Sequence, residues 1–108
     1  MIIYVAAPYS SKNPIRRWLR YRKANQYAAK LMDEGHIVFS PLSHSVPISY
    51  YIGNPTDTIF CIRQDIYWLQ YCDEIHILQL RGWQKSKVLK YEVRKAIKLD
   101  IPRRYIQQ

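Results

Sequence analysis

Apolar and polar positions follow two different periods along the 108-residue chain, and segments of the two kinds alternate. Short apolar runs of strand length occupy residues 2–6, 36–40 and 74–80. Segments with an apolar residue every three or four positions, as in an amphipathic helix, occupy residues 14–34, 59–72 and 86–97. A short last strand is predicted near residues 104–106. Strands and helices in alternation predict right-handed crossovers and one parallel sheet covered on both faces, which is an α/β fold.

One connection in this alternating pattern is much longer than the others. Residues 41–58 are rich in Ser, Tyr and Pro, and we interpret them as a loop. Loops of this length in compact domains are commonly functional lids or mobile segments. Because ligands bind at the carboxyl ends of parallel strands, this loop is expected to share one crevice with residues 7–14 and 81–86.

Two carboxylates interrupt the apolar faces of the predicted helices. Glu92 lies within the apolar arc of the last helix, while most basic residues of that helix lie on the opposite side. Asp65 occupies the buried stripe of helix 59–72 in the same way. A buried carboxylate is costly unless it is hydrogen-bonded or lines a cavity. A structural ion pair explains either acid alone, but two such acids are the usual equipment for breaking a glycosidic bond.

Several residues near the predicted crevice suit a nucleotide. Ser86 is placed to cap the last helix, whose first N–H groups form an anion site. Ser10 and Arg17 are candidates for contacts to the same phosphate. Tyr9 and Trp83 are candidates for stacking on a base or for holding the nucleophile. Each of these residues also has an ordinary structural explanation, as a cap or a packed aromatic.

One histidine lies in the long connection, where metal and cofactor motifs are of interest. His44, in the tripeptide 43–45, is either a candidate site residue or an ordinary loop histidine. No second histidine or cysteine has a spacing suited to a metal, and there is no dinucleotide-binding or P-loop motif. Neither a metal nor a cofactor is therefore expected.

The bulk charge adds a class of partner to this picture. The formal net charge is +9, concentrated in residues 12–30 and 81–104. Such a field attracts phosphates, on a nucleotide or on a polynucleotide, although solvated helix faces explain it as well. The length fits a single domain over residues 1–108, without a signal peptide or an apolar run of membrane-spanning length. With Cys61 and Cys72 interpreted as buried thiols, a soluble cytoplasmic protein is expected.

Four motifs together resemble the nucleoside 2-deoxyribosyltransferase superfamily, which includes the nucleoside 5′-monophosphate N-glycosidases. The motifs are Tyr4-Val5-Ala6-Ala7-Pro8-Tyr9, Gly35 with Ser40-Pro41, Asp65-Ile66-Tyr67-Trp68-Leu69 with Cys72-Asp73, and Gly82-Trp83 with Ser86 and Glu92. Their order spans nearly the whole chain. It is most similar to a small bacterial and phage branch, a domain of unknown function, with a Gly-Trp-x-x-Ser signature.

The resemblance implies a flavodoxin-like three-layer sandwich with four or five parallel strands. It also implies that Glu92 is the nucleophile that attacks C1′, and that Asp65 binds the sugar and assists protonation. Tyr9 resembles the tyrosine that orients the glutamate, and Ser86 resembles the serine that binds phosphate in the monophosphate hydrolases. Members of the superfamily are commonly dimers or larger, so a homo-oligomer is expected.

These observations favour an N-glycosidase or 2-deoxyribosyltransferase that acts on a (deoxy)nucleoside 5′-monophosphate through a glutamate nucleophile. Val88 stands where the superfamily pattern usually has glycine, which keeps open a nucleotide-binding or sensor module without turnover. A basic nucleic-acid-binding protein is the third hypothesis that the charge allows.

Overall fold

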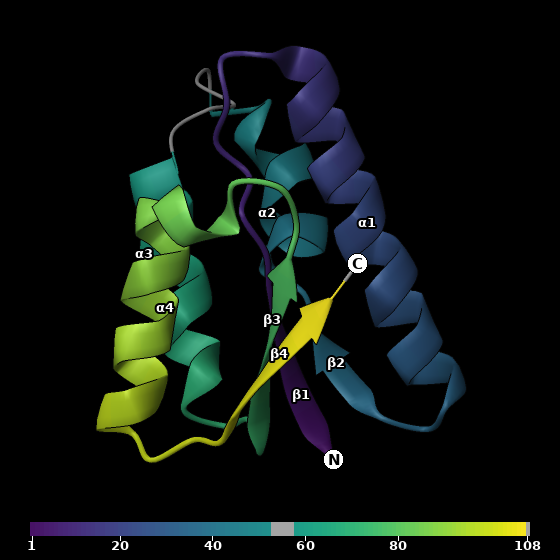
Figure 1. Cartoon of the computed structure of the whole chain (residues 1–108), viewed down its shortest axis with the longest axis vertical. Helices are drawn as coiled ribbons and strands as arrows, with labels where there is room; N and C mark the ends of the chain where they lie inside the picture. Colours follow the sequence, from purple (N-terminus) through teal and green to yellow (C-terminus); the bar gives the residue numbers. More distant parts are fainter. Residues whose placement is uncertain (53–57, 108) are drawn as a thin grey trace.

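The computed structural model describes residues 1–52 and 58–107 and confirms an α/β fold built on one parallel sheet (Figure 1). In these residues the strands are β1 (Ile2–Ala6), β2 (Ile37–Phe39), β3 (Glu74–Gln79) and β4 (Arg103–Gln107). Their order in the sheet is β2-β1-β3-β4, and every neighbouring pair is parallel. The order reverses between β1 and β3, and ligands of open α/β sheets bind outside the carboxyl ends of the strands at such a reversal.

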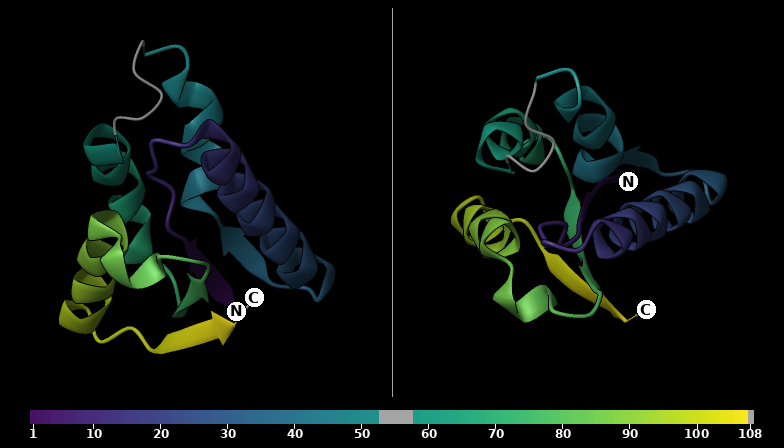
Figure 2. Two further views of the ribbon diagram at one scale, coloured as in Figure 1. Left: turned by 45° about the horizontal axis from the view of Figure 1, so that its top comes forward. Right: turned by 90° about the horizontal axis from the view of Figure 1, so that it is seen from above.

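Helices cover both faces of the sheet and make the three expected layers (Figure 2). They are α1 (Pro14–Asp33), α2 (Pro41–Ser49), α3 (Thr58–Leu69) and α4 (Lys87–Lys98), with a short 3₁₀ helix η1 (Trp83–Lys85) before α4. α1 lies on one face, α3 and α4 lie on the other, and α2 contacts both α1 and α3. Within the described residues, no helix is both long and apolar enough to cross a membrane.

The prediction of a loop over residues 41–58 is wrong for its first half, which forms α2. Pro41 starts this helix, where its missing N–H costs no hydrogen bond. Ser45 and Ser49 lie on the buried side, at positions where a helix signal in the sequence requires apolar residues. The small polar side chains therefore concealed the helix. Residues 53–57, in the second half of the predicted loop, lie outside the described residues.

The predicted helix boundaries agree with the caps. The Asn13 side chain accepts hydrogen bonds from the first amides of α1, and Gly35, with φ of +94°, follows the end of that helix. The Ser86 hydroxyl accepts a hydrogen bond of 3.2 Å from the Leu89 amide, so Ser86 caps α4 as predicted.

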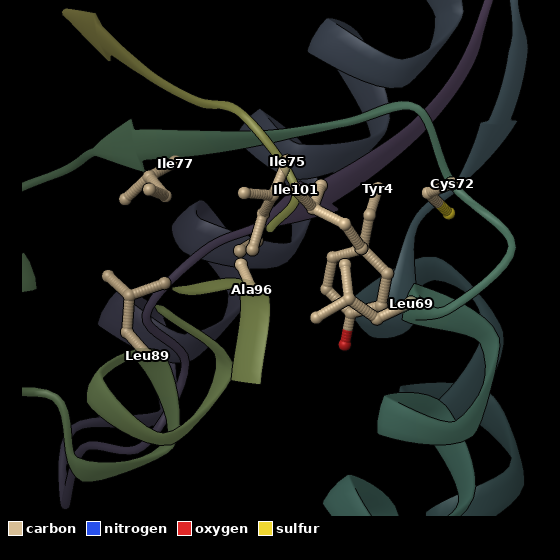
Figure 3. Packing of buried hydrophobic residues seen from close by; sticks show 9 residues of the cluster. Tyr4, Leu69, Cys72, Ile75, Ile77, Leu89, Ala96 and Ile101 are labelled. Atoms are coloured by element: carbon tan, nitrogen blue, oxygen red, sulfur yellow. The ribbon is translucent and has the colours of Figure 1, made fainter. Parts of the chain in front are cut away.

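The core consists of two apolar clusters, one on each face of the sheet, because successive side chains of β1 point to opposite faces. Ile3 and Val5 pack toward α1. Tyr4 and Ala6 pack toward α3 and α4, and Figure 3 shows Tyr4 beside Leu69 in that cluster. The same cluster holds the buried thiol of Cys72, whereas nothing is described of the Cys61 side chain.

Candidate functional site

A buried carboxyl–phenol pair joins α4 to the central strand β1. Glu92 is only 2% exposed, and the Tyr4 hydroxyl donates a hydrogen bond of 2.5 Å to Glu92 Oε2. No cation in residues 1–52 or 58–107 forms an ion pair with this carboxyl. Burial raises the pKa of Glu92 to about 8; the hydrogen bond from Tyr4 opposes this shift, and the charge of Asp65 adds to it. Glu92 is thus a buried acid without a cationic partner among the described residues, at a position where an apolar side chain such as Leu or Ala would make the fold more stable.

Asp65, on α3, is the second buried carboxyl on this face of the sheet. The Ser45 hydroxyl lies 2.8 Å from Asp65 Oδ1 and 2.7 Å from Oδ2, and His44 Nδ1 lies 3.3 Å from Oδ1. Burial raises the pKa of Asp65, while the hydrogen bond from Ser45 and the proximity of His44 oppose the rise. Both partners come from α2, so the helix that the sequence concealed positions this acid. His44 is half exposed and connects Asp65 to solvent.

The two carboxyls act on the same phenol. Burial raises the pKa of Tyr4 well above its ordinary value, and the charges of Glu92 and Asp65 raise it further. Asp65 also raises the pKa of Glu92, although the two acids lie on different helices. β1, α3 and α4 therefore bring both acids into one desolvated region, within electrostatic reach of each other.

The phenol that donates a hydrogen bond to Glu92 is that of Tyr4, whereas the resemblance assigns the orienting role to Tyr9. The Tyr4 ring extends from β1 toward the helices (Figure 3), whereas Tyr9 lies beyond the end of the strand. Tyr9 lines a hollow of about 520 Å³ between α1 and α2, which we call the aromatic hollow. The signal for Tyr4 was present in the sequence, because a phenol inside a buried strand needs a polar partner.

A second hollow, of about 750 Å³, contains both candidate phosphate serines, Ser10 and Ser86. We call it the basic hollow, because its wall includes five cationic side chains: Arg16, Arg20, Arg81, Lys85 and Lys87. Val88 also lines it, and Glu92 follows Val88 by four residues, or about 6 Å along the axis of α4 at ~1.5 Å per residue. The Glu92 carboxyl and the basic hollow are therefore close neighbours along α4.

The remaining predicted binding residues lie elsewhere. Arg17 lines the aromatic hollow, and its Nη1 donates a hydrogen bond of 2.5 Å to the Ser11 carbonyl. Trp83 packs against the apolar cluster and the Tyr105 ring, with ring centroids 5.7 Å apart. Among the described residues, the loops of the predicted crevice thus line at least two hollows, one containing Tyr9 and the other the next residue, Ser10.

The strand order and the layers define the class of the protein as flavodoxin-like α/β. The chain belongs to the DUF1937 family, a domain of unknown function, whose family model matches residues 1–104. It is similar to a solved structure of a 2-deoxyribosyltransferase from the psychrotolerant bacterium Bacillus psychrosaccharolyticus, with a TM-score of 0.72 and 19% identity. The match covers 99% of this chain and 72% of that chain. No curated protein sequence matches the chain.

The structural likeness confirms the fold that the motif resemblance implies. At 19% identity it shows a shared fold alone. The Gly-Trp-x-x-Ser signature, at residues 82–86, stays a prediction.

Proposed function

We propose that this protein is an N-glycosidase or 2-deoxyribosyltransferase that acts on a (deoxy)nucleoside 5′-monophosphate through Glu92. The observation that carries the proposal is the buried Glu92 carboxyl, which is hydrogen-bonded by Tyr4 and electrostatically coupled to Asp65, beside the basic hollow. A phosphate bound near Ser86 and Val88 would bring the sugar toward Glu92, because one sugar ring spans a distance similar to one helical turn, ~5.4 Å.

The proposed reaction has two steps. In the first, a Glu92 carboxylate oxygen bonds to C1′ while the bond from C1′ to the base nitrogen breaks, and its electron pair leaves with the base. Asp65 donates the proton that the base nitrogen takes up. In the second step, water attacks C1′, releases Glu92 and returns a proton to Asp65, giving a sugar phosphate. Attack by the nitrogen of a second base instead gives transfer.

Burial favours this division of labour at Asp65 and opposes it at Glu92. Glu92 must be ionised to attack, and the hydrogen bond from Tyr4 favours its ionised form, whereas burial favours the neutral one. The raised pKa of Asp65 favours the proton donor that the leaving base requires. The reaction requires that Glu92 and Asp65 together hold one proton. Activity should therefore fall both when the pair gains a second proton and when it loses its last one, which gives a bell-shaped pH profile with an alkaline limb near pH 8. Because Glu92 is fully buried, substrate entry requires an opening motion that exposes the carboxyl.

The proposal is tested by incubating the protein with a panel of nucleosides and nucleotides and measuring the free base by liquid chromatography. We expect base release from at least one 5′-phosphorylated nucleoside, and none above background from the Glu92→Gln variant. Base release at the same rate by the wild type and the variant would exclude Glu92 as the nucleophile.

One observation favours a second candidate function, a nucleotide-binding module without turnover. The branched side chain of Val88 stands in the wall of the basic hollow, where the superfamily pattern usually has glycine. This candidate predicts nucleotide binding without base release over hours. A Val88→Gly variant separates the two functions, because it would gain base release only if Val88 blocks an otherwise competent site.

The protein is also proposed to be a homo-oligomer located in the cytoplasm. α3 and the turn after it carry three exposed aromatic rings in mutual contact, those of Tyr67, Trp68 and Tyr71, with centroids 5.4–6.2 Å apart. Clustered exposed aromatics are typical of protein interfaces, which supports a homo-oligomer. Light scattering coupled to size-exclusion chromatography tests the assembly. A cytoplasmic location fits the proposed nucleotide substrate.

A further inference from the structure

The basic hollow carries more positive charge than one phosphate group requires. Five cationic side chains line it, and no acidic side chain of the described residues does. A terminal phosphate monoester carries a charge of about −1.5 to −2 at neutral pH. One such group would therefore leave most of the positive charge uncompensated.

The protein itself does not neutralise this charge. The ion pairs within the described part of the chain involve Asp65 and Glu74, and neither acid pairs with a cation of the basic hollow. Arg20 shows the effect of the crowding, because burial lowers its pKa and the positive charge of Arg16 lowers it further. Like charges gathered around an open space repel one another, and this repulsion is relieved when an anion binds between them.

The hollow is built to hold these charges around a space and not along one helix face. Arg16 and Arg20 come from α1, Arg81 and Lys85 come from the connection between β3 and α4, and Lys87 comes from the start of α4. Arg20 joins the two sides, since Nη1 donates to the Ser10 carbonyl at 2.8 Å and Nη2 donates to the Arg81 carbonyl at 2.7 Å.

Gly82 permits this close approach. It has a φ of +82°, and an added Cβ would lie 3.0 Å from Arg20 Nη2. A volume of about 750 Å³ is within the range of ~300–1,000 Å³ typical of small-molecule sites and exceeds the need of one phosphate.

We propose that the basic hollow binds a chain of two or three phosphates, so that the site of the proposed reaction accepts nucleoside 5′-di- and triphosphates as well as monophosphates. This inference rests on the proposed function, because it takes the end at Ser86 and Val88 as the end nearest the sugar. The phosphate chain then runs from Val88 toward Arg16 at the start of α1. Lys87 contacts the phosphate nearest the sugar, Arg16, Arg81 and Lys85 contact the phosphates beyond it, and Arg20 holds the wall in place.

The test measures binding without turnover. The full chain is titrated calorimetrically with inorganic phosphate, pyrophosphate and tripolyphosphate at one fixed ionic strength, because salt screens such contacts. We expect tripolyphosphate to bind at least tenfold more tightly than phosphate. Deoxynucleoside triphosphates should exceed the matching monophosphates by a similar factor. Equal affinity for phosphate and tripolyphosphate would overturn the proposal.

Two arginine variants on the same helix show whether the hollow is responsible. Arg16→Ala removes a charge that lines it, whereas Arg22→Ala removes an exposed charge that packs over the Trp18 ring. We expect Arg16→Ala to weaken tripolyphosphate binding at least tenfold and Arg22→Ala to weaken it less than twofold, with unchanged unfolding temperatures. Equal losses would contradict a defined site. Arg20 is avoided because it also ties the connections together.

A single-stranded oligonucleotide provides the last comparison. If it binds more tightly than tripolyphosphate, and both arginine variants weaken it equally, the charge serves a polynucleotide and the proposal fails. Failure of the polyphosphate proposal and failure of the proposed reaction give different results. Tripolyphosphate binding without base release would refute the proposed reaction and leave the hollow as a polyphosphate site. Base release restricted to monophosphates would support the reaction and refute the polyphosphate site.

Discussion

The two faces of the sheet each bury a tyrosine hydroxyl beside carboxyl chemistry, but they compensate it differently. On the face covered by α1, the Tyr27 hydroxyl lies 2.7 Å from His76 Nδ1, and His76 Nε2 lies 3.2 Å from Glu74 Oε1. This series of hydrogen bonds ends at a cation, because Arg104 Nε donates to Glu74 Oε2 at 2.9 Å. On the opposite face, Glu92 has the Tyr4 hydroxyl and a second acid nearby, and no cation among the described residues.

The pKa values of the two glutamates shift in opposite directions as a result. Burial alone would raise the pKa of Glu74, but hydrogen bonds from Arg104 and His76 prevail and lower it. Burial prevails at Glu92 and raises its pKa to about 8. Compensated carboxylates stabilise a fold, whereas uncompensated ones are retained where chemistry needs them. The comparison therefore supports the proposal that Glu92 is a functional residue and that Glu74 is a structural one.

The largest expected effect separates the two glutamates by activity. Glu92→Gln should lower kcat/KM on the order of 10³-fold or more, because the nucleophile is lost while the amide still fills the space. Glu74→Gln should leave kcat/KM within about threefold and lower stability by roughly 1–3 kcal/mol, because it weakens buried hydrogen bonds. Base-release kinetics and urea unfolding check both. Equal losses of activity would remove the distinction between the two faces.

The next effect concerns stability against pH. Glu92 has a pKa of 4.5 when unfolded and about 8 when folded, so its contribution to stability is complete below pH 4.5 and is lost as the pH rises through 8. At about 1.4 kcal/mol per pKa unit, the loss by pH 9 is on the order of 5 kcal/mol. Glu92→Gln should not show this loss, so it should be more stable than the wild type at pH 9. Urea unfolding at pH 5, 7 and 9 measures the difference, and parallel curves for both proteins would contradict it.

The two tyrosines offer a matched pair of smaller effect. Tyr4→Phe removes the hydrogen bond that lowers the pKa of Glu92, so the alkaline limb of the pH profile should move to higher pH. The rate at pH 7 should fall by about 10- to 100-fold, because the carboxylate is less ionised and less well oriented. Tyr27→Phe, on the other face, should change neither the rate nor the profile. An unmoved alkaline limb in Tyr4→Phe would argue against control of Glu92 by this phenol.

The smallest expected effect tests the partner of Asp65. Ser45→Ala removes the hydrogen bond that opposes the rise in the Asp65 pKa, so the acid limb of the profile should move to higher pH, with a rate loss of about 3- to 10-fold. Ser43→Ala is the control, since the Ser43 hydroxyl contacts Ser40 and Asn25 and not Asp65. Identical profiles for the two serine variants would show that Ser45 does not tune the acid.

The features that the sequence predicted are those governed by local periodicity. The inward positions of Glu92 and Asp65 follow from the helical stripes of α4 and α3, and the cap at Ser86 follows from its position before an apolar period. The parallel sheet follows from the alternation of strands and helices. These predictions do not depend on which helices and strands contact one another in the folded protein.

The features that the sequence missed depend on tertiary contacts. Ser45 lies on the buried side of α2 because it serves Asp65, so the helix has polar residues where periodicity expects apolar ones. Strand alternation gives the face of Tyr4 but does not show that α4 places an acid above it. Arg17 and Arg20 share one helix face, and only the packing of α1 against the β3–α4 connection decides that Arg20 reaches the basic hollow.

The most direct measurement of the central claim is intact-protein mass spectrometry of a reaction quenched in acid during turnover. If Glu92 is the nucleophile, part of the wild-type protein should gain the mass of the substrate without its base, and peptide mapping should place the added mass on Glu92. The Glu92→Gln variant should show no adduct and release no base. Base release by the wild type with no adduct, together with unchanged release by Glu92→Gln, would contradict the claim.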